Sequence, residues 1–525
     1  MKVTIKLFVI CFICLVIPFI AVDSAVAIDD PLLAWVVRQD LSDDLATDVA
    51  VDASGNVYVT GTYQTADAGT LGGNDVVVLK YGSSGNLLWQ RFFNLPMEAG
   101  SRIKLDSADN VYVAGTHYKA DPPAGREPYL VKYDPSGNKL WEAYHPIIEP
   151  GWLVDLEVDE EGNAYILCDD VTTGLFKYNS AGVQQWETFV LGTRPNDLEV
   201  DNGGNIFVTG AILYSLSEGN SIVTRKYAGL NGDELWEEIT YINDEIDIGF
   251  TLSVDSTGDV YVAGMSWSNN AVLKYDGFSG DLEWTARYAG PEWDEARASA
   301  VDGNNNLFVA GNSKDSTGLF YDCLTVKYDD IGNRLWEARY DGPSNNEDLC
   351  GRGSLVLDSS GNAYVLSASK GGVPLRHDFA IISYDPNGFE KWVTRYDGPA
   401  HGSDYSSKIT IDAAGNLYVT GSSWNGIDDD IVTVKYVERT PVNAINILSD
   451  FIEGASLNVG IERSLDAQLG NALKLISKGQ VNAAVNILQA LINHVLDLKG
   501  YELDDDQADT IIQKVQEIID LILSL

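Results

Sequence analysis

Four tryptophans lie in segments that the rest of the chain does not repeat, and each has polar or charged residues near it in sequence. Aromatic rings beside hydrogen-bonding groups are typical of surfaces that recognise sugars or peptides. The sequence therefore predicts a binding surface that includes Trp152, Trp267, Trp293, Trp424, His117, Arg126, Arg376, His377 and His401. Carboxylates near them in sequence include Asp294, Glu295 and Asp404. The alternative, that the tryptophans only cover the ends of the repeats, stays open.

An acidic run and two cysteines form further candidate sites. Asp428, Asp429 and Asp430 could bind a hard cation such as calcium, which prefers carboxylate oxygens; a solvated loop is the alternative. Cys323 and Cys350 flank one pair of predicted repeats and could form a disulfide in an oxidising compartment. The sequence requires no other cofactor.

No motif for catalysis stands out. The chain contains no Gly-x-Ser-x-Gly, no His-Glu-x-x-His and no glycine-rich phosphate loop. A reaction needs its residue once, so side chains that recur in every repeat are better explained by the fold. We therefore predict that the recurring aspartates form turns, the lysines lay their stems along blade edges and the tryptophans anchor the packing.

Self-similarity over residues 32–437 defines the elements that position these groups. The sequence Asp-x-x-Gly-Asn-x-aromatic-Val, as in DASGNVYV from Asp52, occurs eight times in exact or variant form, at spacings of 42 to 56 residues. Each copy but the last is followed by a second element such as KYGSSGNLLW, which ends at Trp89. Each unit contains four short runs rich in Val, Tyr and Trp, in the first about 46–51, 57–62, 76–81 and 87–93. Four-stranded units of this length are typical of propeller blades.

The two ends of the repeat array complete each other. The eighth unit stops after Tyr436 without a tryptophan strand, while Trp35 lies in such a strand ahead of the first unit. A last blade shared by both ends would close the ring and remove its open edge. We therefore expect a mainly β protein with an eight-bladed propeller, and seven blades if the 42-residue unit forms none.

The repeat carries a family resemblance. The elements D-x-x-G-N-x-Y-V-x-G and K-Y-x-x-x-G-x-x-x-W, with Tyr-x-Gly-Pro at Tyr288, Tyr340 and Tyr396, resemble the SBBP β-propeller repeats over nearly all of residues 32–437. The resemblance implies an exported or surface protein and no particular chemistry. The family's name suggests seven blades, and the count of eight departs from it.

After Pro441 the apolar residues change to helical spacing, which predicts four helices near 442–453, 461–478, 480–498 and 505–523. Four helices of this length can close a small bundle. The run GIERSLDAQLGNALKLISKGQVNAAVNILQALINHV resembles the FIMAH domain, which implies an accessory or docking role. We expect a propeller over 28–440 and a helical domain over 441–525.

The N-terminus predicts export. Lys2 and Lys6 precede an apolar run, and Ala25 to Ala27 form a small-x-small cleavage pattern, so residues 1–27 read as a signal peptide; an uncleaved membrane anchor is the alternative. The mature protein would be secreted, periplasmic or at the cell surface, with no membrane insertion. The net charge of −42 disfavours nucleic acid and anionic lipid as partners.

Two functions stay open at this point. The first is a non-enzymatic binding protein that takes a glycan or an extracellular or surface protein on the variable loops of the propeller. The second is an exported propeller enzyme, such as a quinoprotein-like dehydrogenase or a lyase. Eight blades with Gly-x-x-x-Trp turns are similar to quinoprotein repeats, but the full motif of that family is absent.

Overall fold

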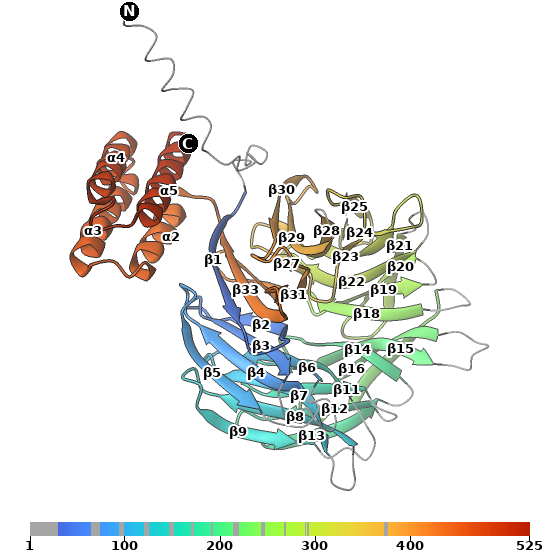
Figure 1. Ribbon diagram of the computed structural model, residues 1–525. Helices are drawn as coiled ribbons and strands as arrows, with labels where there is room; N and C mark the ends of the chain where they lie inside the picture. Colours follow the sequence, from blue (N-terminus) through green and yellow to red (C-terminus); the bar gives the residue numbers. More distant parts are fainter. Residues whose placement is uncertain are drawn as a thin grey trace, which may run out of the picture.

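A computed structural model describes residues 30–64, 74–93, 99–119, 125–145, 152–169, 173–190, 193–213, 220–242, 247–266, 269–288, 290, 293–371 and 376–524. These residues form eight antiparallel sheets arranged as a ring, followed by four helices (Figure 1). The chain is thus an eight-bladed β-propeller with a helical C-terminal segment, and the eight-blade prediction is confirmed. The predicted signal peptide and Trp267 lie outside the described residues.

Each blade has four strands, numbered here from the centre of the ring outward. Blade 1 consists of β2 Leu45–Val51, β3 Val57–Gln64, β4 Asn74–Tyr81 and β5 Leu87–Phe93, and blade 2 of β6 Ala99–Leu105, β7 Val111–Lys119, β8 Gly125–Tyr133 and β9 Lys139–Tyr144. Blade 3 consists of β10 Trp152–Val158, β11 Ala164–Asp169, β12 Thr173–Tyr178 and β13 Gln184–Val190, and blade 4 of β14 Thr193–Val200, β15 Ile206–Leu213, β16 Asn220–Tyr227 and β17 Glu234–Thr240. The 42-residue unit forms a complete four-stranded blade, although its strands β11 and β12 have only six residues each.

The remaining blades follow the same order, with one interruption. Blade 5 consists of β18 Asp247–Val254, β19 Val260–Ser266, β20 Asn269–Tyr275 and β21 Leu282–Tyr288, and blade 6 of β22 Asp294–Val301, β23 Leu307–Lys314, β24 Tyr321–Tyr328 and β25 Arg334–Tyr340. Blade 7 consists of β26 Asp348–Leu349, β27 Leu355–Leu357, β28 Ala363–Gly371, β29 Arg376–Tyr384 and β30 Glu390–Tyr396, and blade 8 of β31 Asp404–Ile411, β32 Leu417–Trp424, β33 Asp429–Val437 and β1 Leu32–Gln39. In blade 7 the innermost strand is split into β26 and β27, both paired with β28.

The N-terminal strand closes the ring, as predicted. β1 pairs antiparallel with β33, so the last blade contains both ends of the propeller chain (Figure 1). The innermost strands β2 and β31 lie in contact, which completes the circle. The middle strands are buried on both faces by neighbouring sheets, as β3 shows with its six consecutive buried residues from Val57 to Thr62.

The C-terminal segment forms four helices close to the predicted bounds: α2 Pro441–Gly454, α3 Val459–Ile476, α4 Val481–Leu498 and α5 Asp505–Ser524. Thr440 caps α2 by accepting a bond from the amide of Asn443, and Pro441 occupies the first turn, where a missing N–H costs nothing. One apolar core joins the helices, and it includes Ile445, Leu465, Leu488 and Val515. The resemblance to a FIMAH domain stays a prediction. None of the described helices is long and apolar enough to cross a membrane.

Candidate functional site

The recurring aspartate forms the hairpin between the two inner strands of each blade. In blade 2, Asp106 Oδ1 accepts bonds from the amides of Ala108 and Asn110 at 3.0 and 2.9 Å. Asp106 Oδ2 accepts from Asn110 Nδ2 at 2.9 Å and lies 3.0 Å from Lys132 Nζ. Burial acts to raise the pKa of Asp106, but the bonds from Asn110 and Lys132 outweigh it and leave the pKa below its usual value. The aspartate is therefore a turn former, as the repeat predicted.

The recurring lysine and tryptophan connect each blade to the next. Lys80 Nζ and Trp89 Nε1 both donate to the carbonyl of Pro135, in the outer hairpin of blade 2, at 2.9 and 3.1 Å. Lys177 and Trp186 bind Gly229 in blade 4 in the same way. We call the side of the ring that holds these hairpins the turn face. The opposite side, which holds the connections between strands 2 and 3 and between blades, is the loop face.

Three of the predicted binding residues lie on the loop face of blades 2 and 3. The guanidinium carbon of Arg126 lies 3.9 Å from the ring centroid of Trp152, whose side chain is about half exposed. His117 is buried, and its Nε2 lies 3.1 Å from Glu127 Oε2. Arg126 and Trp152 therefore offer an accessible platform, whereas His117 is part of the packing beneath it.

A second group lies on blades 7 and 8. Arg376 is exposed at the start of β29, and the ring of His377 lies 5.1 Å from that of Tyr405. His401 is exposed, and a contact of 2.7 Å from its Nδ1 to Asp397 raises its pKa. Because blade 1 separates blade 8 from blade 2, the predicted residues form at least two separate groups on the loop face.

The two other described tryptophans have different surroundings. Trp424 packs on Gly402, where an added Cβ would lie 2.4 Å from Trp424 Cβ. Trp293 precedes β22 and is 36 % exposed. The nearby carboxylates Asp294 and Asp404 accept bonds from the amides of Gly290 and Gly398 and so fix the connections that precede their strands.

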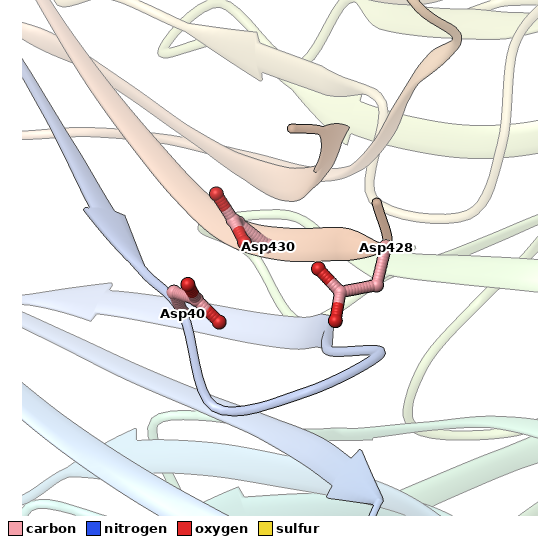
Figure 2. Close-up of side chains that lie close together, drawn as sticks. All are labelled: Asp40, Asp428 and Asp430. Atoms are coloured by element: carbon pink, nitrogen blue, oxygen red, sulfur yellow. The ribbon is translucent and has the colours of Figure 1, made fainter. Parts of the chain in front are cut away.

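The acidic run lies on the loop face where the ring closes. Asp428 and Asp430 turn toward Asp40, which follows the N-terminal strand β1 (Figure 2). One carboxylate oxygen from each of these three residues lies within 4.8 Å of the other two. Asp429, the third member of the predicted run, lies outside this group because neighbouring residues of a strand point to opposite faces.

A polar channel runs through the centre of the ring, and sequence reasoning did not find it. Its volume is about 480 Å³, and all eight innermost segments contribute to its wall. In most blades the register of the innermost strand shifts once, as between Ala46 and Asp48 in β2 or between Pro195 and Asp197 in β14. Such bulges re-aim the following side chain, which places it in the channel.

Charges of opposite sign occupy different sectors of this channel. Carboxylates come mainly from blades 3 and 4, whereas the cationic side chains come from blades 2, 7 and 8. Lys104 Nζ lies 2.5 Å from Glu157 Oε1, and Lys408 Nζ lies 3.2 Å from Asp48 Oδ1. The charged wall residues are Asp48, Arg102, Lys104, Asp155, Glu157, Asp197, Glu199, Arg352 and Lys408.

Crowding of carboxylates shifts their proton affinity. Burial and the nearby carboxylate of Asp155 raise the pKa of Asp197 to about 8. Burial and Glu157 raise the pKa of Glu199 in the same way. On the other side of the channel, burial acts to raise the pKa of Asp48, but Lys408 and the other cations nearby outweigh it and lower that pKa. The two sides of the channel therefore shift the pKa of their carboxylates in opposite directions.

Arg352 crosses this channel from blade 7 to blade 4. Its guanidinium donates to the backbone carbonyl and to Oδ1 of Asn196, at 2.8 and 2.9 Å. Arg352 lies between β26 and β27, in the segment that interrupts the innermost strand of blade 7. The interruption therefore provides a segment whose Arg352 side chain reaches across the channel.

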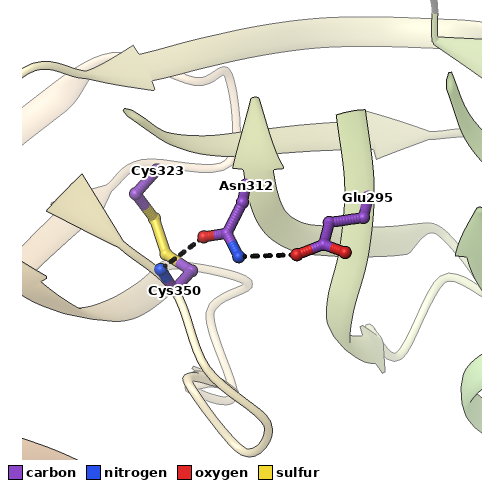
Figure 3. Close-up of a disulfide and its surroundings, with 4 residues drawn as sticks. All are labelled: Glu295, Asn312, Cys323 and Cys350. Carbon is purple, nitrogen blue, oxygen red and sulfur yellow. Dashed lines mark hydrogen bonds between the residues drawn. A yellow bond between two sulfur atoms is a disulfide. The ribbon is translucent and has the colours of Figure 1, made fainter. Parts of the chain in front are cut away.

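A disulfide anchors the start of that loop. Cys350 is bonded to Cys323 of blade 6, with a Cα–Cα distance of 5.4 Å (Figure 3). The amide of Cys350 donates to Asn312 Oδ1 at 2.8 Å, and Asn312 Nδ2 donates to Glu295 Oε1 at 3.0 Å. The position of Arg352 thus depends on contacts to two strands of the preceding blade. Cys168 is buried and is not part of this disulfide.

The channel residues had a signal in the sequence. Except for Arg352, the charged residues of the channel wall occupy the fourth or the second position before the repeated Asp. The fourth position is Asp48, Arg102, Asp155, Asp197, Thr251, Ala298, Ser354 and Lys408 in blades 1 to 8. This position lies at the same place in every blade, but its residue type changes from blade to blade. Because function is expected where the repeats differ, the sequence alone could have pointed to this position.

Comparisons with known proteins agree with the propeller fold. A family model of the SBBP β-propeller repeat matches residues 392–428. An uncharacterized WD repeat-containing protein, L264 of Acanthamoeba polyphaga mimivirus, is 24 % identical over 453 residues, which covers 64 % of this chain and 31 % of that protein. The chain thus spans about a third of the length of this relative.

Among solved structures, the chain is similar to the Dos1 propeller and to the C-terminal WD40 domain of Sif2. Both are 10 % identical, with TM-scores of 0.50 and 0.49; the matches cover 78 % of this chain, 96 % of the Dos1 chain and 99 % of the Sif2 chain. At this identity the likeness concerns the fold alone. The fold and the repeat define the class, a β-propeller repeat protein.

Proposed function

We propose that the protein is an exported or cell-surface binding protein that takes a glycan or a protein partner on the loop face of its propeller and catalyses no reaction. The observation that carries this proposal is the stacking of Arg126 on the half-exposed Trp152. A ring with a cation fixed over it gives a sugar or a peptide both an apolar surface and a hydrogen-bond donor. Rigid scaffolds commonly carry their binding residues on such connections.

The side chains of the two faces differ in what they bond to, and this difference supports a binding site on the loop face. On the turn face, the recurring Asp, Lys and Trp side chains bond to their own hairpin or to the next blade, as in blades 1 and 2. The loop-face connections differ from blade to blade in length and in residue type. Partner specificity therefore belongs on the loop face, because a specific partner requires residues that are not repeated.

The test is binding of the purified chain without residues 1–27 to a glycan array and to a set of purified surface proteins. Trp152→Ala should weaken retention of any bound ligand at least tenfold, because a central aromatic contact contributes about 2 kcal/mol or more. Arg126→Ala should have a smaller effect of the same sign. The matched control is Phe278→Ala, which removes a 93 % exposed ring from the turn face.

Equal binding by wild type and Trp152→Ala, or a loss confined to Phe278→Ala, would contradict the use of the loop face. Absorbance and metal content of the same preparation test the alternative function. A bound quinone with stoichiometric calcium would show a quinoprotein-like dehydrogenase and remove the non-enzymatic proposal.

A further inference from the structure

Seven of the eight blade junctions are closed on the turn face by the same contact. At each of them, the repeated tryptophan of one blade donates through Nε1 to a backbone carbonyl in the outer hairpin of the next blade, at 2.8 to 3.3 Å. At six of them, the repeated lysine donates to the same carbonyl. The junctions therefore bind the hairpin through its backbone, whatever its side chains are.

A glycine of the hairpin packs on the tryptophan at each of these seven junctions. A Cβ added to the glycine would lie 2.5 to 3.0 Å from an atom of that indole, and the glycine has a φ between 74° and 86°. Another residue would be strained there and would collide with the ring. The seven glycines are Gly85, Gly137, Gly182, Gly232, Gly280, Gly332 and Gly388. The surroundings of each tryptophan are thus shaped for a β-turn that contains glycine.

The junction between blades 7 and 8 has no such hairpin. The two outer strands of blade 8 are β33 and β1, which are the two ends of the propeller chain: the chain leaves after Val437 toward α2 and enters through Pro31 (Figure 1). Trp392 occupies the repeated position in blade 7. In the part of the chain that the structure describes, no acceptor binds its Nε1.

The repeated lysine is also absent from this junction. Ser383 pairs with Trp392 in the register in which Lys80 pairs with Trp89 in blade 1. Ser383 Oγ is buried, and among the described residues it has no hydrogen-bond partner. A serine is too short to reach the next blade as lysine does. Of the two donors that bind a hairpin elsewhere, one is therefore unused here and the other is replaced.

A groove lies at the place of the missing hairpin. Its volume is about 580 Å³, within the range of about 300 to 1,000 Å³ that is typical of binding clefts. The inner hairpins of blades 7 and 8 and the two ends of the propeller chain form its walls, which include Pro31, Tyr364, Trp392, Ala414, Tyr436 and Arg439. Arg439 Nε donates to the carbonyl of Asp30 at 2.8 Å, so the two chain ends are bonded to each other beside it. We call this cavity the 7–8 groove.

We propose that the 7–8 groove binds an exposed, glycine-containing β-turn of a separate protein, in the place that a hairpin of this chain takes at the other junctions. Trp392 Nε1 would donate to a carbonyl of that turn, and the glycine of the turn would pack on the indole. An Asp or Asn at the start of the turn suits this role. In blade 2, Asp134 Oδ1 accepts bonds from the amides of Ser136 and Asn138 at 2.9 and 2.8 Å, which holds the turn in shape by itself.

A separate protein fits the groove better than a second copy of this chain. The seven outer hairpins of a second copy already occupy their own junctions. Two copies also repel each other, because each carries a net charge of −42. The partner therefore supplies a turn of its own. The groove lies on the turn face, so this proposal does not depend on the binding site proposed for the loop face.

The probe for this site is a turn that the protein itself accepts. A dye-labelled cyclic peptide with the sequence KYDPSGNKLW, residues 132–141, is titrated with the purified protein, and binding is measured by fluorescence anisotropy. We expect one peptide per chain with a dissociation constant of about 10 µM to 1 mM, because the contact is small. The same peptide with Gly137→Val should bind at least tenfold more weakly, since its added side chain would collide with the indole.

Two substitutions in blade 7 should change the affinity in opposite directions. Ser383→Lys restores the second donor of the other junctions and should tighten binding about threefold or more. Trp392→Phe removes Nε1 and keeps an aromatic ring, so it should weaken binding at least fivefold. The matched control is Trp336→Phe, the same change at the junction between blades 6 and 7, where a hairpin of this chain accepts the bond; it should bind the peptide like the wild type.

Absence of binding at 5 mM peptide, equal binding of the Gly137→Val peptide, or equal weakening by Trp336→Phe would overturn the proposal. Circular dichroism identifies a variant that has not folded. Ala414→Arg then serves as the second variant, because Ala414 is exposed and a long side chain there would fill the groove; unchanged binding by this variant would overturn the proposal as well. Sedimentation tests the other occupant: a wild-type dimer that Ala414→Arg dissociates would assign the groove to a second copy and overturn the assignment to a separate protein.

Discussion

Two positions on the same innermost strands follow opposite rules. The aspartate at the end of each strand is the same in all eight blades, and it forms the same hairpin each time. Four residues earlier, the residue differs: it is acidic in blades 1, 3 and 4, basic in blades 2 and 8, and uncharged in blades 5 to 7, although blade 7 brings Arg352 into the channel instead. The difference shows that ring closure requires the same hairpin in every blade, whereas the residues of the channel wall can vary from blade to blade.

Deletion of the closing strand β1 should lower the stability of the propeller more than any other change considered. Without residues 30–39, blade 8 loses its outer strand and the bond from Trp35 Nε1 to the carbonyl of Ser83. An exposed edge on β33 would follow. We expect a fall of more than about 10 °C in the midpoint of thermal unfolding, or failure to fold, measured by circular dichroism.

Removal of the helical segment is the control for this deletion. A chain that ends at Thr440 keeps all eight blades, so the propeller transition should stay within a few degrees of its original midpoint. If the two truncations had equal effects, the closure by β1 would not be the feature that stabilises the ring.

Removal of the disulfide tests the variable channel wall, because the disulfide anchors the segment from which Arg352 reaches across the channel. It closes a loop of 27 residues in sequence separation, which corresponds to about 3.5 kcal/mol of stability in the chain-entropy model. Cys350→Ser should lower the free energy of unfolding by about that amount, measured in urea. Reductant should lower the stability of the wild type by a similar amount and leave the variant unchanged; a loss that reductant does not reproduce would assign the effect to packing.

Two substitutions in blade 2 compare the repeated and the variable positions directly, one in the hairpin that follows β6 and one at the channel-facing position of β6. Asp106→Ala leaves Asn110 and Lys132 without their carboxylate, and we expect a cost of about 2 to 3 kcal/mol. Arg102→Ala removes only a partly exposed pair with Asp155 at 3.6 Å and should cost about 1 kcal/mol or less. Denaturant unfolding of both variants measures the difference; equal costs would mean that the channel wall is as constrained as the hairpins.

The same contrast explains what the sequence could predict. Repetition made the blades, the hairpin role of Asp52 and its equivalents, and the closing strand at Trp35 visible, because each appears eight times or completes a pattern. The stacking of Arg126 on Trp152 joins two connections of different blades, and no local pattern brings them together. Asp40 joins Asp428 and Asp430 for the same reason: these residues are neighbours only because the ring closes. Arg352 could not be placed because its strand is interrupted.

The channel carboxylates give an expected effect that depends on pH. An unfolded aspartate has a pKa near 4, whereas Asp197 in the folded protein has a pKa of about 8. Between these values the folded protein holds a proton that the unfolded chain has released, so the contribution of this group to stability falls as the pH rises from about 4 to about 8. Asp197→Asn cannot ionise and should reduce the loss of stability between pH 5 and pH 8 by about 1 to 2 kcal/mol, a value kept low because the channel is open to solvent. Urea unfolding at both pH values measures this, with the exposed Asp520→Asn as control. An unchanged pH slope in Asp197→Asn would mean that the carboxylates of blades 3 and 4 do not share a proton, and that this side of the channel is as inert electrostatically as the uncharged walls of blades 5 and 6.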